Sequence, residues 1–470
     1  MQADPLRWKA LAIVCAAFFM TILDVSIVNV ALPSIGKSLN FSRDNLQWVI
    51  TAYAITFGGL LLLAGRLADL FGRRRVFLVG VVIFTLASLV CGLAWSEGVL
   101  IASRAVQGIG AAVITPSALS IVMTTFEEGS ERNKALGIWG ALGGGGAAVG
   151  VLAGGLLTKY LGWEWIFFVN VPVGALAFLV APRFVRESKA ERETSQDFGG
   201  AIAVTSGLAL LVYAVSEAPN YGWESTRTIV TLIIAVALLL AFLAIESRAK
   251  DPLMPFRIFR IHTVAGANII GLFLGVVTFA NFFLLTLYVQ QVLGYSALKT
   301  GITFVATAGT AVLWAGLAQA LTTKIGVKPV LTVGFLAMTA GSVWYTQIPT
   351  HGSFWGALLP GYLLIGFALP FTFIPVSIAA LAGVDHDEAG LASGLINTAQ
   401  QVGGAIGVAV CSSVSISRFD HLVSTHGFAS AFTSGTRIGF WVLVGVSVAA
   451  LLAGLTLISN EELAAEPVTA

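Results

Sequence analysis

The residue best placed to do chemistry in this chain is Asp24, an acidic side chain well inside a long apolar segment. Nearly every other charged residue falls in a predicted loop. A carboxylate in hydrocarbon costs roughly 2.5–3.5 kcal/mol on insertion scales, so such residues usually have a function. Two interpretations are open: an acid held in a structural ion pair, or a site that binds a proton or a cation. The second is preferred.

Arg104 is a second charged candidate, and it lies in another apolar segment with Gln107 on the same helical face. If the first segment enters the membrane near Ala10, Asp24 lies about 21 Å along it at a helical rise of about 1.5 Å per residue. Arg104 lies roughly 8 Å from the opposite surface by the same rise. In a hydrocarbon core about 30 Å thick, the two side chains have similar depths. We therefore expect them to be able to meet.

The composition identifies the broad class of protein. Hydrophobic residues make up 57% of the 470 residues and charged residues only 11%, whereas ordinary soluble domains carry about a quarter charged residues. The 51 glycines are typical of membrane helices that pack closely. The chain is predicted to be an all-α polytopic membrane protein.

Apolar runs of about 20 residues predict transmembrane helices. Fourteen such runs are present, and the first lacks a small-residue cleavage site, so we expect a retained helix and not a signal peptide. The predicted spans are 10–30, 46–65, 76–95, 99–123, 134–159, 164–182, 199–217, 228–245, 263–290, 298–322, 330–348, 354–380, 390–416 and 437–458.

The distribution of basic residues predicts the orientation. With the N-terminus in the cytosol, inside segments hold eighteen Lys and Arg residues and outside loops seven, and Arg104 within a span completes the 26. This excess follows the positive-inside rule and predicts that both termini are cytosolic. The three cysteines, Cys15, Cys91 and Cys411, all fall in spans and are expected to pack as small apolar residues. Their spacing predicts neither a disulfide framework nor a metal site.

Two internal repeats divide the chain into halves. Three glycines of the fifth span recur in the thirteenth at a constant offset of 257: Gly137, Gly146, Gly150 and Gly394, Gly403, Gly407. The segment around Gly72, after span two, resembles the segment around Gly326, after span ten, at an offset of 254. The predicted organisation is six, two and six helices: bundle 1–185, an additional pair with its linkers 186–262, and bundle 263–470. Transporters are commonly built from such repeats, with the substrate site between the halves.

The loop Gly65-Arg-Leu-Ala-Asp-Leu-Phe-Gly-Arg-Arg-Arg75 resembles the signature loop of the major facilitator superfamily, and the whole chain resembles its fourteen-helix drug:proton antiporters of the EmrB/QacA type. In that family the loop is a latch that steadies one orientation of the two halves. Its glycines permit a tight turn, and Asp69 can present a carboxylate to a helix N-terminus. The residues of the predicted latch are Gly65, Arg66, Asp69, Gly72, Arg73 and Arg74. The linkers 183–197 and 246–260, rich in charge of both signs, are interpreted as solvated surface without a partner.

Three further segments carry the resemblance. The segment 100–110 resembles the fourth-helix motif whose arginine, here Arg104, is associated with proton coupling. The fifth helix resembles the antiporter motif, with Val151 where proline is usual. Asp24, Asn29 and Pro33 match the first-helix motif of this branch. The glycines of the predicted antiporter helix are Gly137, Gly146, Gly150, Gly154 and Gly155. Glu164 replaces a usual arginine, and nothing in the sequence explains the exchange.

The resemblance implies a proton-coupled antiporter that exports hydrophobic, often cationic, small molecules from the cell membrane. The predicted proton-coupling pair is Asp24 and Arg104. Polar and aromatic residues that could line a substrate cavity through cation–π contacts are Asn29, Gln107, Phe279, Asn281, Phe282, Phe283, Tyr288 and Trp314. From Val264 through Val384 there is no Asp or Glu, so a second intramembrane acid is not expected there.

Other functions are less consistent with the sequence. An exporter of an endogenous lipid or secondary metabolite, in which Arg104 matters more than Asp24, remains the alternative within transport. An intramembrane enzyme would need a cluster of catalytic or metal-binding residues at membrane depth, and a sensor would be expected to carry an added soluble domain; neither is found in the sequence. We expect no metal, no cofactor, no nucleic-acid partner, and a monomer in the lipid bilayer.

Overall fold

The computed structural model describes residues 6–126, 130–188, 198–249, 252, 256–384 and 389–458, and this part of the chain is helical throughout, without a strand. The helices are α1 (Arg7–Ser38), α2 (Arg43–Leu46), α3 (Trp48–Phe71), α4 (Arg73–Gly92), α5 (Glu97–Thr125), α6 (Ser130–Tyr160), α7 (Trp165–Phe168), α8 (Asn170–Phe184), α9 (Phe198–Tyr221), α10 (Thr226–Glu246), α11 (His262–Gln291), α12 (Ala297–Ile325), α13 (Val327–Tyr345), α14 (Leu359–Ala379), α15 (Ala389–His426) and α16 (Phe428–Leu457). A 3₁₀ turn (Phe256–Arg260) precedes α11, and a π turn (Phe354–Leu358) precedes α14.

These helices confirm a multi-pass membrane protein. Eleven helical segments in the described part of the chain are long and apolar enough to cross a membrane, and α3, α6 and α9 contain shorter apolar stretches. Each of the fourteen predicted spans coincides with one helix, or with α7 and α8 together for the sixth. The number of helices that cross the membrane stays a prediction.

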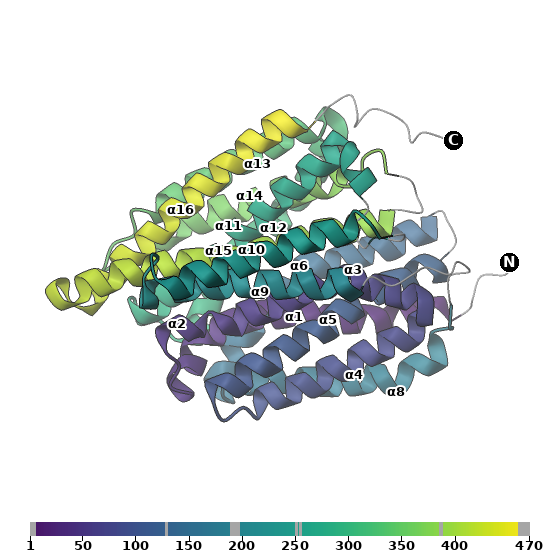
Figure 1. The fold of residues 1–470 in the computed structure, drawn as a ribbon, viewed down its shortest axis with the longest axis horizontal. Coiled ribbons are helices and arrows are strands. Elements are labelled where there is room, and N and C mark those ends of the chain that lie inside the picture. Colours follow the sequence, from purple (N-terminus) through teal and green to yellow (C-terminus); the bar gives the residue numbers. More distant parts are fainter. Residues whose placement is uncertain are drawn as a thin grey trace.

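The long helices run side by side in two bundles (Figure 1). Helices α1 to α8 pack mainly on one another, as do helices α11 to α16. The start of α1 and the end of α16 lie at the same end of the molecule, which we call the terminal end, and the opposite end is the far end (Figure 1). The bundles meet where α6 contacts α12, α3 contacts α15, and α1 contacts α11 and α12.

Single glycines make the turns between two pairs of these helices, and serine N-caps begin four of the helices. Gly72 (φ 101°) links α3 to α4, and Gly326 (φ 90°) links α12 to α13, each as a single residue between two helices. Only glycine adopts such backbone angles readily, so the two residues paired by the predicted repeat make the same turn. At the far end, serine side chains accept from a backbone N–H at the start of the next helix. These N-caps are Ser42, Ser96, Ser225 and Ser296, which begin α2, α5, α10 and α12.

The two repeated glycine rows make equivalent close contacts. A Cβ added to Gly150 would lie 3.0 Å from the carbonyl oxygen of Leu23 in α1. A Cβ added to Gly407 would lie 2.7 Å from the carbonyl oxygen of Val276 in α11. Each row therefore brings its helix against the backbone of the first helix of its own bundle, as small residues do in membrane helix pairs.

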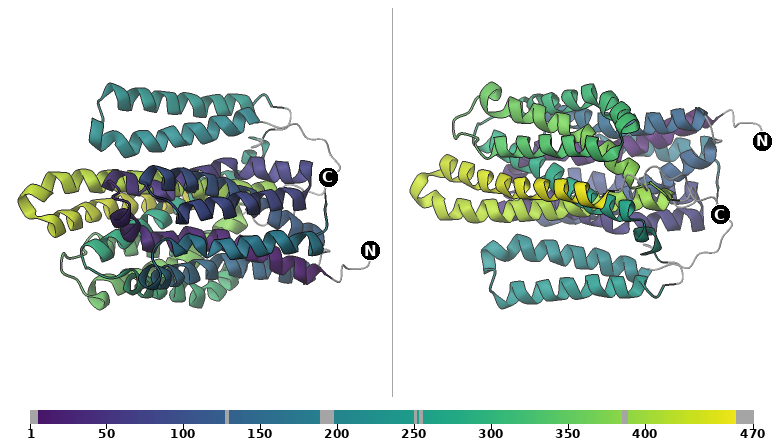
Figure 2. Two further views of the ribbon diagram at one scale, coloured as in Figure 1. Left: turned by 90° about the horizontal axis from the view of Figure 1, so that it is seen from below. Right: turned by 90° about the horizontal axis from the view of Figure 1, so that it is seen from above.

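Helices α9 and α10 form a separate pair on one side of the molecule (Figure 2). α9 packs against α3 of one bundle and against α15 of the other, whereas α10 packs on α9. Leu208 and Val212 of α9 share an apolar cluster with Ala54 of α3 and Ala405 of α15. The pair thus lies over the line where the two bundles meet.

At the far end the bundles touch backbone to backbone. A Cβ on Gly155 of α6 would lie 2.9 Å from the Cα of Leu298, and a Cβ on Gly301 of α12 would lie 2.7 Å from the carbonyl oxygen of Val151. Close by, the Gln290 side-chain amide donates a hydrogen bond of 2.8 Å to the Val30 carbonyl. α6 is a continuous helix through Val151, the position where proline is usual in the family it resembles.

Toward the terminal end α12 diverges from α6. Residues three or four apart on a helix share one face, so the face of Gly301 continues through Val305, Gly309, Val312 and Gly316. Val312 is 63% exposed, and a Cβ on Gly309 or Gly316 would meet no atom within 4 Å. The bundles are therefore closed together at the far end and separated along this face at the terminal end.

The close contact at Gly155 leads to a test of how the far end is held shut. Gly155→Leu places a side chain where backbone atoms of Leu298 lie, so we expect the bundles to separate at the far end. Spin labels at the exposed positions Lys37 and Lys299 should then report a longer mean distance. Gly309→Leu, which adds the same side chain in open space, should leave the distance unchanged. Equal distances in both variants would contradict this account of the closure.

Candidate functional site

The centre of the first bundle holds a buried ion pair between Asp24 of α1 and Arg104 of α5, as the depth estimate from the sequence predicts. Arg104 donates from Nη1 to Oδ2 of Asp24. Oδ1 of Asp24 accepts from the Gln107 amide at 2.9 Å and from the Asn170 amide at 3.2 Å. All four residues are at most 1% exposed. The carboxylate thus has three donors in an environment closed to solvent.

The guanidinium of Arg104 has partners besides Asp24. Its Nε donates to the Val49 carbonyl at 2.9 Å, and its Nη1 donates to Oε1 of Gln107 at 2.6 Å. The guanidinium carbon lies 4.4 Å from the centre of the Tyr53 ring and 5.7 Å from that of Phe167. Aromatic faces stabilise a desolvated cation, so Arg104 keeps several favourable contacts even when one partner is lost.

A second ring of polar side chains orients the amides. Ser88 of α4 accepts from Gln107 and from Asn170, both at 3.1 Å, and donates to the Phe167 carbonyl at 2.9 Å. The Cys91 thiol lies 3.2 Å from the Ser103 hydroxyl and 3.5 Å from Oε1 of Gln107. Cys91 therefore packs in the apolar core, as the sequence predicts, and its thiol also borders the polar cluster.

The hydrogen bonds around Asp24 match a carboxylate without a proton. An ionised carboxylate accepts hydrogen bonds only, whereas a protonated one must also donate. With three donors directed at it, the Asp24 carboxylate fits the ionised form in this conformation. The side chains of α1, α5 and α8 meet here, so protonation of Asp24 would change contacts between three helices. No group of three or more metal-ligating side chains occurs in the described part of the chain.

One member of the cluster, Gln107, was assigned to another site by the sequence analysis, and a second, Asn170, was missed. Gln107 was predicted to line a substrate cavity, but its amide bonds with Asp24 and Arg104. Asn170 was not singled out, although a lone Asn near the start of an apolar span is a signal for a buried polar contact. Asn29, on the same helix as Asp24, donates to the Val25 carbonyl of its own helix at 2.9 Å.

The predicted latch loop is held by a residue that the sequence analysis interpreted as solvated. Glu187, which follows α8, accepts from the backbone N–H of Arg74 at 3.0 Å and of Arg75 at 3.2 Å. It also lies 3.7 Å from each of their Nε atoms. A carboxylate at the first turn of α4 is stabilised by the helix dipole. Glu187 is exposed, as expected for a solvated segment, but it also ties this segment to the start of α4.

Other latch residues also contact the segments around the additional pair. Arg66 donates to the carbonyl of Pro252, between α10 and α11, and the backbone N–H of Arg73 donates to Ser188 at 2.9 Å. Gly65 lies against Pro116 of α5. The side chain of Asp69 lies outside the described residues, so its predicted role at a helix N-terminus stays a prediction.

The glycines predicted for the antiporter helix lie in α6, where they contact two helices. Gly146, Gly150 and Gly154 face α1, and Gly155 faces α12. The surroundings of Gly137 lie outside the described residues. Glu164 lies at the start of α7, where its carbonyl accepts from Phe167 at 3.0 Å, and the structure offers no reason for its replacing arginine.

The predicted substrate-cavity residues of the second bundle do not converge on one point. The Tyr288 hydroxyl donates to the Pro349 carbonyl, and Phe282 packs on Phe304 with ring centres 5.1 Å apart. Phe279 lies against Gly404, and Trp314 packs on Phe367 in a separate cluster. Asn281 is buried.

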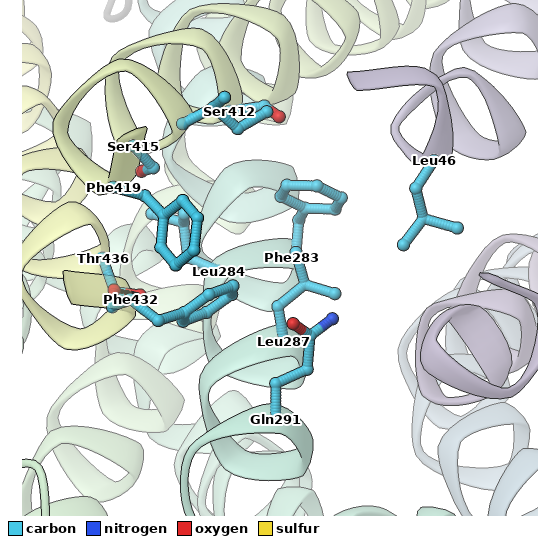
Figure 3. A pocket seen from close by; sticks show the side chains of 11 residues that line it. Leu46, Phe283, Leu284, Leu287, Gln291, Ser412, Ser415, Phe419, Phe432 and Thr436 are labelled. Carbon is cyan, nitrogen blue, oxygen red and sulfur yellow. Dashed lines mark hydrogen bonds between the residues drawn. The ribbon is translucent and has the colours of Figure 1, made fainter. Parts of the chain in front are cut away.

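Phe283, by contrast, faces a pocket at the far end of the second bundle (Figure 3). The pocket is lined by residues of α11, α15 and α16, and by Leu46 of α2 from the first bundle. Its free volume is about 50 Å³, whereas sites for drug-sized ligands hold roughly 300–1,000 Å³. In this conformation it is too small to be a substrate cavity.

Comparison with known proteins agrees with this architecture. Residues 14–408 match the Major Facilitator Superfamily, so the chain belongs to that family of membrane transporters. Solved structures with the same fold include a bacterial homologue of the human lysosomal transporter Spinster in an inward-facing, unoccupied conformation. It has a TM-score of 0.67 and 17% identity, and the match covers 97% of this chain and 98% of that one.

Several curated relatives are named as export or resistance proteins. The chain is 41% identical to the puromycin resistance protein pur8 of Streptomyces alboniger, over 96% of this chain and 90% of the relative. It is 39% identical to the cephamycin export protein CmcT of Amycolatopsis lactamdurans, over 85% and 83% of the two chains. It is 33% identical to the tetracenomycin C resistance and export protein of Streptomyces glaucescens, over 87% and 76%.

The buried pair leads to a stability prediction. Asp24→Asn leaves the Arg104 cation without its counter-charge, so we expect the free energy of unfolding to fall by about 3 kcal/mol. This is the lower end of the range for a broken buried ion pair, because Val49 and Gln107 still accept hydrogen bonds from Arg104. Thermal unfolding of the purified protein should show the loss. Glu131→Gln is the control. Glu131 pairs with Arg7 at the surface, where the guanidinium lowers the pKa of the Glu131 carboxyl. Loss of this exposed pair should leave the unfolding midpoint unchanged.

The turn at Gly72 leads to a second stability prediction. Gly72→Ala adds a Cβ 2.7 Å from a carboxylate oxygen of Glu187, at a backbone angle that costs about 1–2 kcal/mol for other residues. Thermal unfolding should show a lower midpoint. Gly65→Ala, near the end of α3, adds a Cβ at an ordinary contact distance of 3.5 Å and should not lower it. A midpoint that falls equally in both variants would refute the role of the turn.

Proposed function

We propose that the chain is a proton-coupled antiporter that exports hydrophobic small molecules across the cell membrane. The observation that carries the proposal is the Asp24 carboxylate, which is buried away from solvent and accepts from three donors. Among the described residues of α1, α3, α4, α5 and α8, no other Asp or Glu is buried. The relatives supply the direction of transport, since three of those named above carry export or resistance in their names.

The topology belongs to the same proposal. In the sequence, the segments predicted to be inside hold eighteen Lys and Arg residues and the outside loops seven, and the N-terminus is predicted to be inside. Because α1 starts at the terminal end, we assign the terminal end to the cytosol. Fourteen helices would then cross the membrane, as bundle 1–185, the pair 186–262 and bundle 263–470. The divergence of α12 from α6 makes this conformation one that is open to the cytosol, from which an exporter loads.

The proposed cycle exchanges a proton for substrate at alternating sides. After the far end opens, Asp24 takes a proton from outside and loses the charge that pairs it with Arg104. Arg104 stays buried because the Val49 carbonyl, the Gln107 amide and two aromatic rings still stabilise it. One proton moving inward through 100 mV supplies about 2.3 kcal/mol before any pH gradient is added.

α1 connects the proton site with the closure of the far end. Asp24 and Val30 lie on this helix about 9 Å apart at its rise of about 1.5 Å per residue. Val30 accepts the hydrogen bond of Gln290 from the other bundle. A shift of α1 that accompanies protonation therefore acts on a contact that holds the bundles together. We propose that Gln107, Asn170 and Ser88 position Asp24 and do not contact substrate.

The class of substrate has two candidates. Hydrophobic cations are expected from the resemblance to multidrug antiporters. Neutral secondary metabolites or lipids are favoured by one observation in particular: α11 to α14 contain no Asp or Glu, so these helices offer a cation no counter-charge. Each of the three relatives named above is also named for one antibiotic.

Transport in proteoliposomes tests the coupling. With an imposed pH gradient, the wild-type protein should drive uptake of tetraphenylphosphonium or of a neutral dye into inside-out vesicles. Asp24→Asn should abolish this gradient-driven uptake because no proton carrier remains, while exchange of labelled for unlabelled substrate without a gradient should persist. Glu131→Gln should behave as wild type. Full gradient-driven uptake by Asp24→Asn would exclude the proposed role of this residue.

A further inference from the structure

The pocket beside Phe283 lies at the far end of the second bundle, on the side that the proposed orientation places outside the cell. The described residues of its lining are aromatic and aliphatic, with four polar side chains, Gln291, Ser412, Ser415 and Thr436, and none of them is charged. The Ser415 hydroxyl oxygen is buried and has no hydrogen-bond partner. Figure 3 shows Phe283, Phe419 and Phe432 on the same side of the pocket, with Leu46 facing them from the other bundle.

The pocket is tied to the closure of the far end. Gln291 lines it, and the preceding residue, Gln290, makes the hydrogen bond to Val30 across the bundles. Among the described residues, Leu46 alone lines it from the first bundle. When the bundles separate at the far end, the Gln290 contact breaks and Leu46 moves away from Phe283. The pocket then loses one wall and widens toward the outside.

Its present size excludes an aromatic ligand in the closed conformation. The free volume is about 50 Å³, whereas an apolar cavity that holds benzene measures about 150 Å³. A ligand can therefore enter only after the far end opens. Because the lining has aromatic faces and hydroxyls but no carboxylate, it suits a neutral aromatic group that accepts or donates one or two hydrogen bonds.

We propose that this pocket is an outer release site, which holds the neutral aromatic part of an exported compound after the far end opens and expels it when the bundles close. The inference rests on the proposed export function. It adds a binding position for the exported compound, apart from the proton site at Asp24. Phe419, Phe432 and Ser415 then determine which compounds leave slowly. It also predicts that such compounds bind from outside and inhibit export.

Thiol labelling from outside tests the site. Ser415→Cys is nearly isosteric, and in right-side-out vesicles a membrane-impermeant maleimide should label it slowly in the closed protein. Adding Gly155→Leu, which separates the bundles at the far end, should speed labelling about tenfold or more. A tenfold change corresponds to a shift of about 1.4 kcal/mol in the equilibrium between the closed and the open far end. An unchanged rate would show that the pocket does not open with the far end and would overturn the proposal.

Protection from labelling identifies the ligand class. In the Gly155→Leu background, N-phenyl-1-naphthylamine, a neutral aromatic amine, should slow labelling of Ser415→Cys, and tetraphenylphosphonium should not. Adding Phe432→Ala should raise the protecting concentration about tenfold, as expected for a lost aromatic contact. The matched control is Phe428→Ala, a Phe of the same hairpin that stacks on Phe432 but does not line the pocket, and it should leave protection unchanged.

The outcomes separate this inference from the export function. Equal protection in Phe432→Ala and the control, or protection by the cation alone, would overturn the release site. Gradient-driven uptake that depends on Asp24, measured in the same Ser415→Cys protein in inside-out vesicles, would then still support export. Conversely, protection without such uptake would leave a ligand site on a protein that is not a proton-coupled exporter.

Discussion

The structure depends on one physical constraint: a carboxylate and a guanidinium are buried together in an apolar bundle, and every donor and acceptor near them needs a partner. Removing two charges from water costs several kcal/mol each, and their attraction repays this only with good geometry and further hydrogen bonds. Here the chain supplies those bonds from α3, α4, α5 and α8 around α1. The order of packing in the first bundle follows from that requirement.

Glycine determines where the remaining helices approach one another. In the second bundle a Cβ on Gly403 would lie 2.0 Å from the Leu272 carbonyl oxygen, and between the bundles Gly155 and Gly301 remove the side chains that would hold α6 and α12 apart. Without water in the bilayer, such close packing contributes attraction that apolar side chains alone do not. The contacts inside each bundle occur along the helices, whereas the α6–α12 contact occurs at the far end, so this seam can open without unpacking either bundle.

The sequence predicted the helices and the charged pair well because both leave strong signals. Apolar runs are conspicuous, and Asp24 and Arg104 are rare charges at comparable depth. Ser88 and Asn170 left weak signals, because uncharged polar residues are common in membrane helices. Glu187 was missed for the opposite reason: its charge lies among many others in a linker, and only the three-dimensional path of the chain brings it to α4. The aromatic residues of α11 face several directions, which their spacing alone did not resolve.

The position of α9 has a consequence for the membrane around the protein. Because α9 lies against both α3 and α15, one of the two lines along which the bundles meet is walled off from lipid by a helix pair of the same chain. The other line, between α6 and α12, has no such cover among the described helices. The two sides of the molecule that face the bilayer therefore differ: α9 and α10 cover the line between the bundles on one side, and the line between α6 and α12 is uncovered on the other. In the proposed cycle, lipids and dissolved apolar compounds would reach the separating surfaces only from the side of α6 and α12.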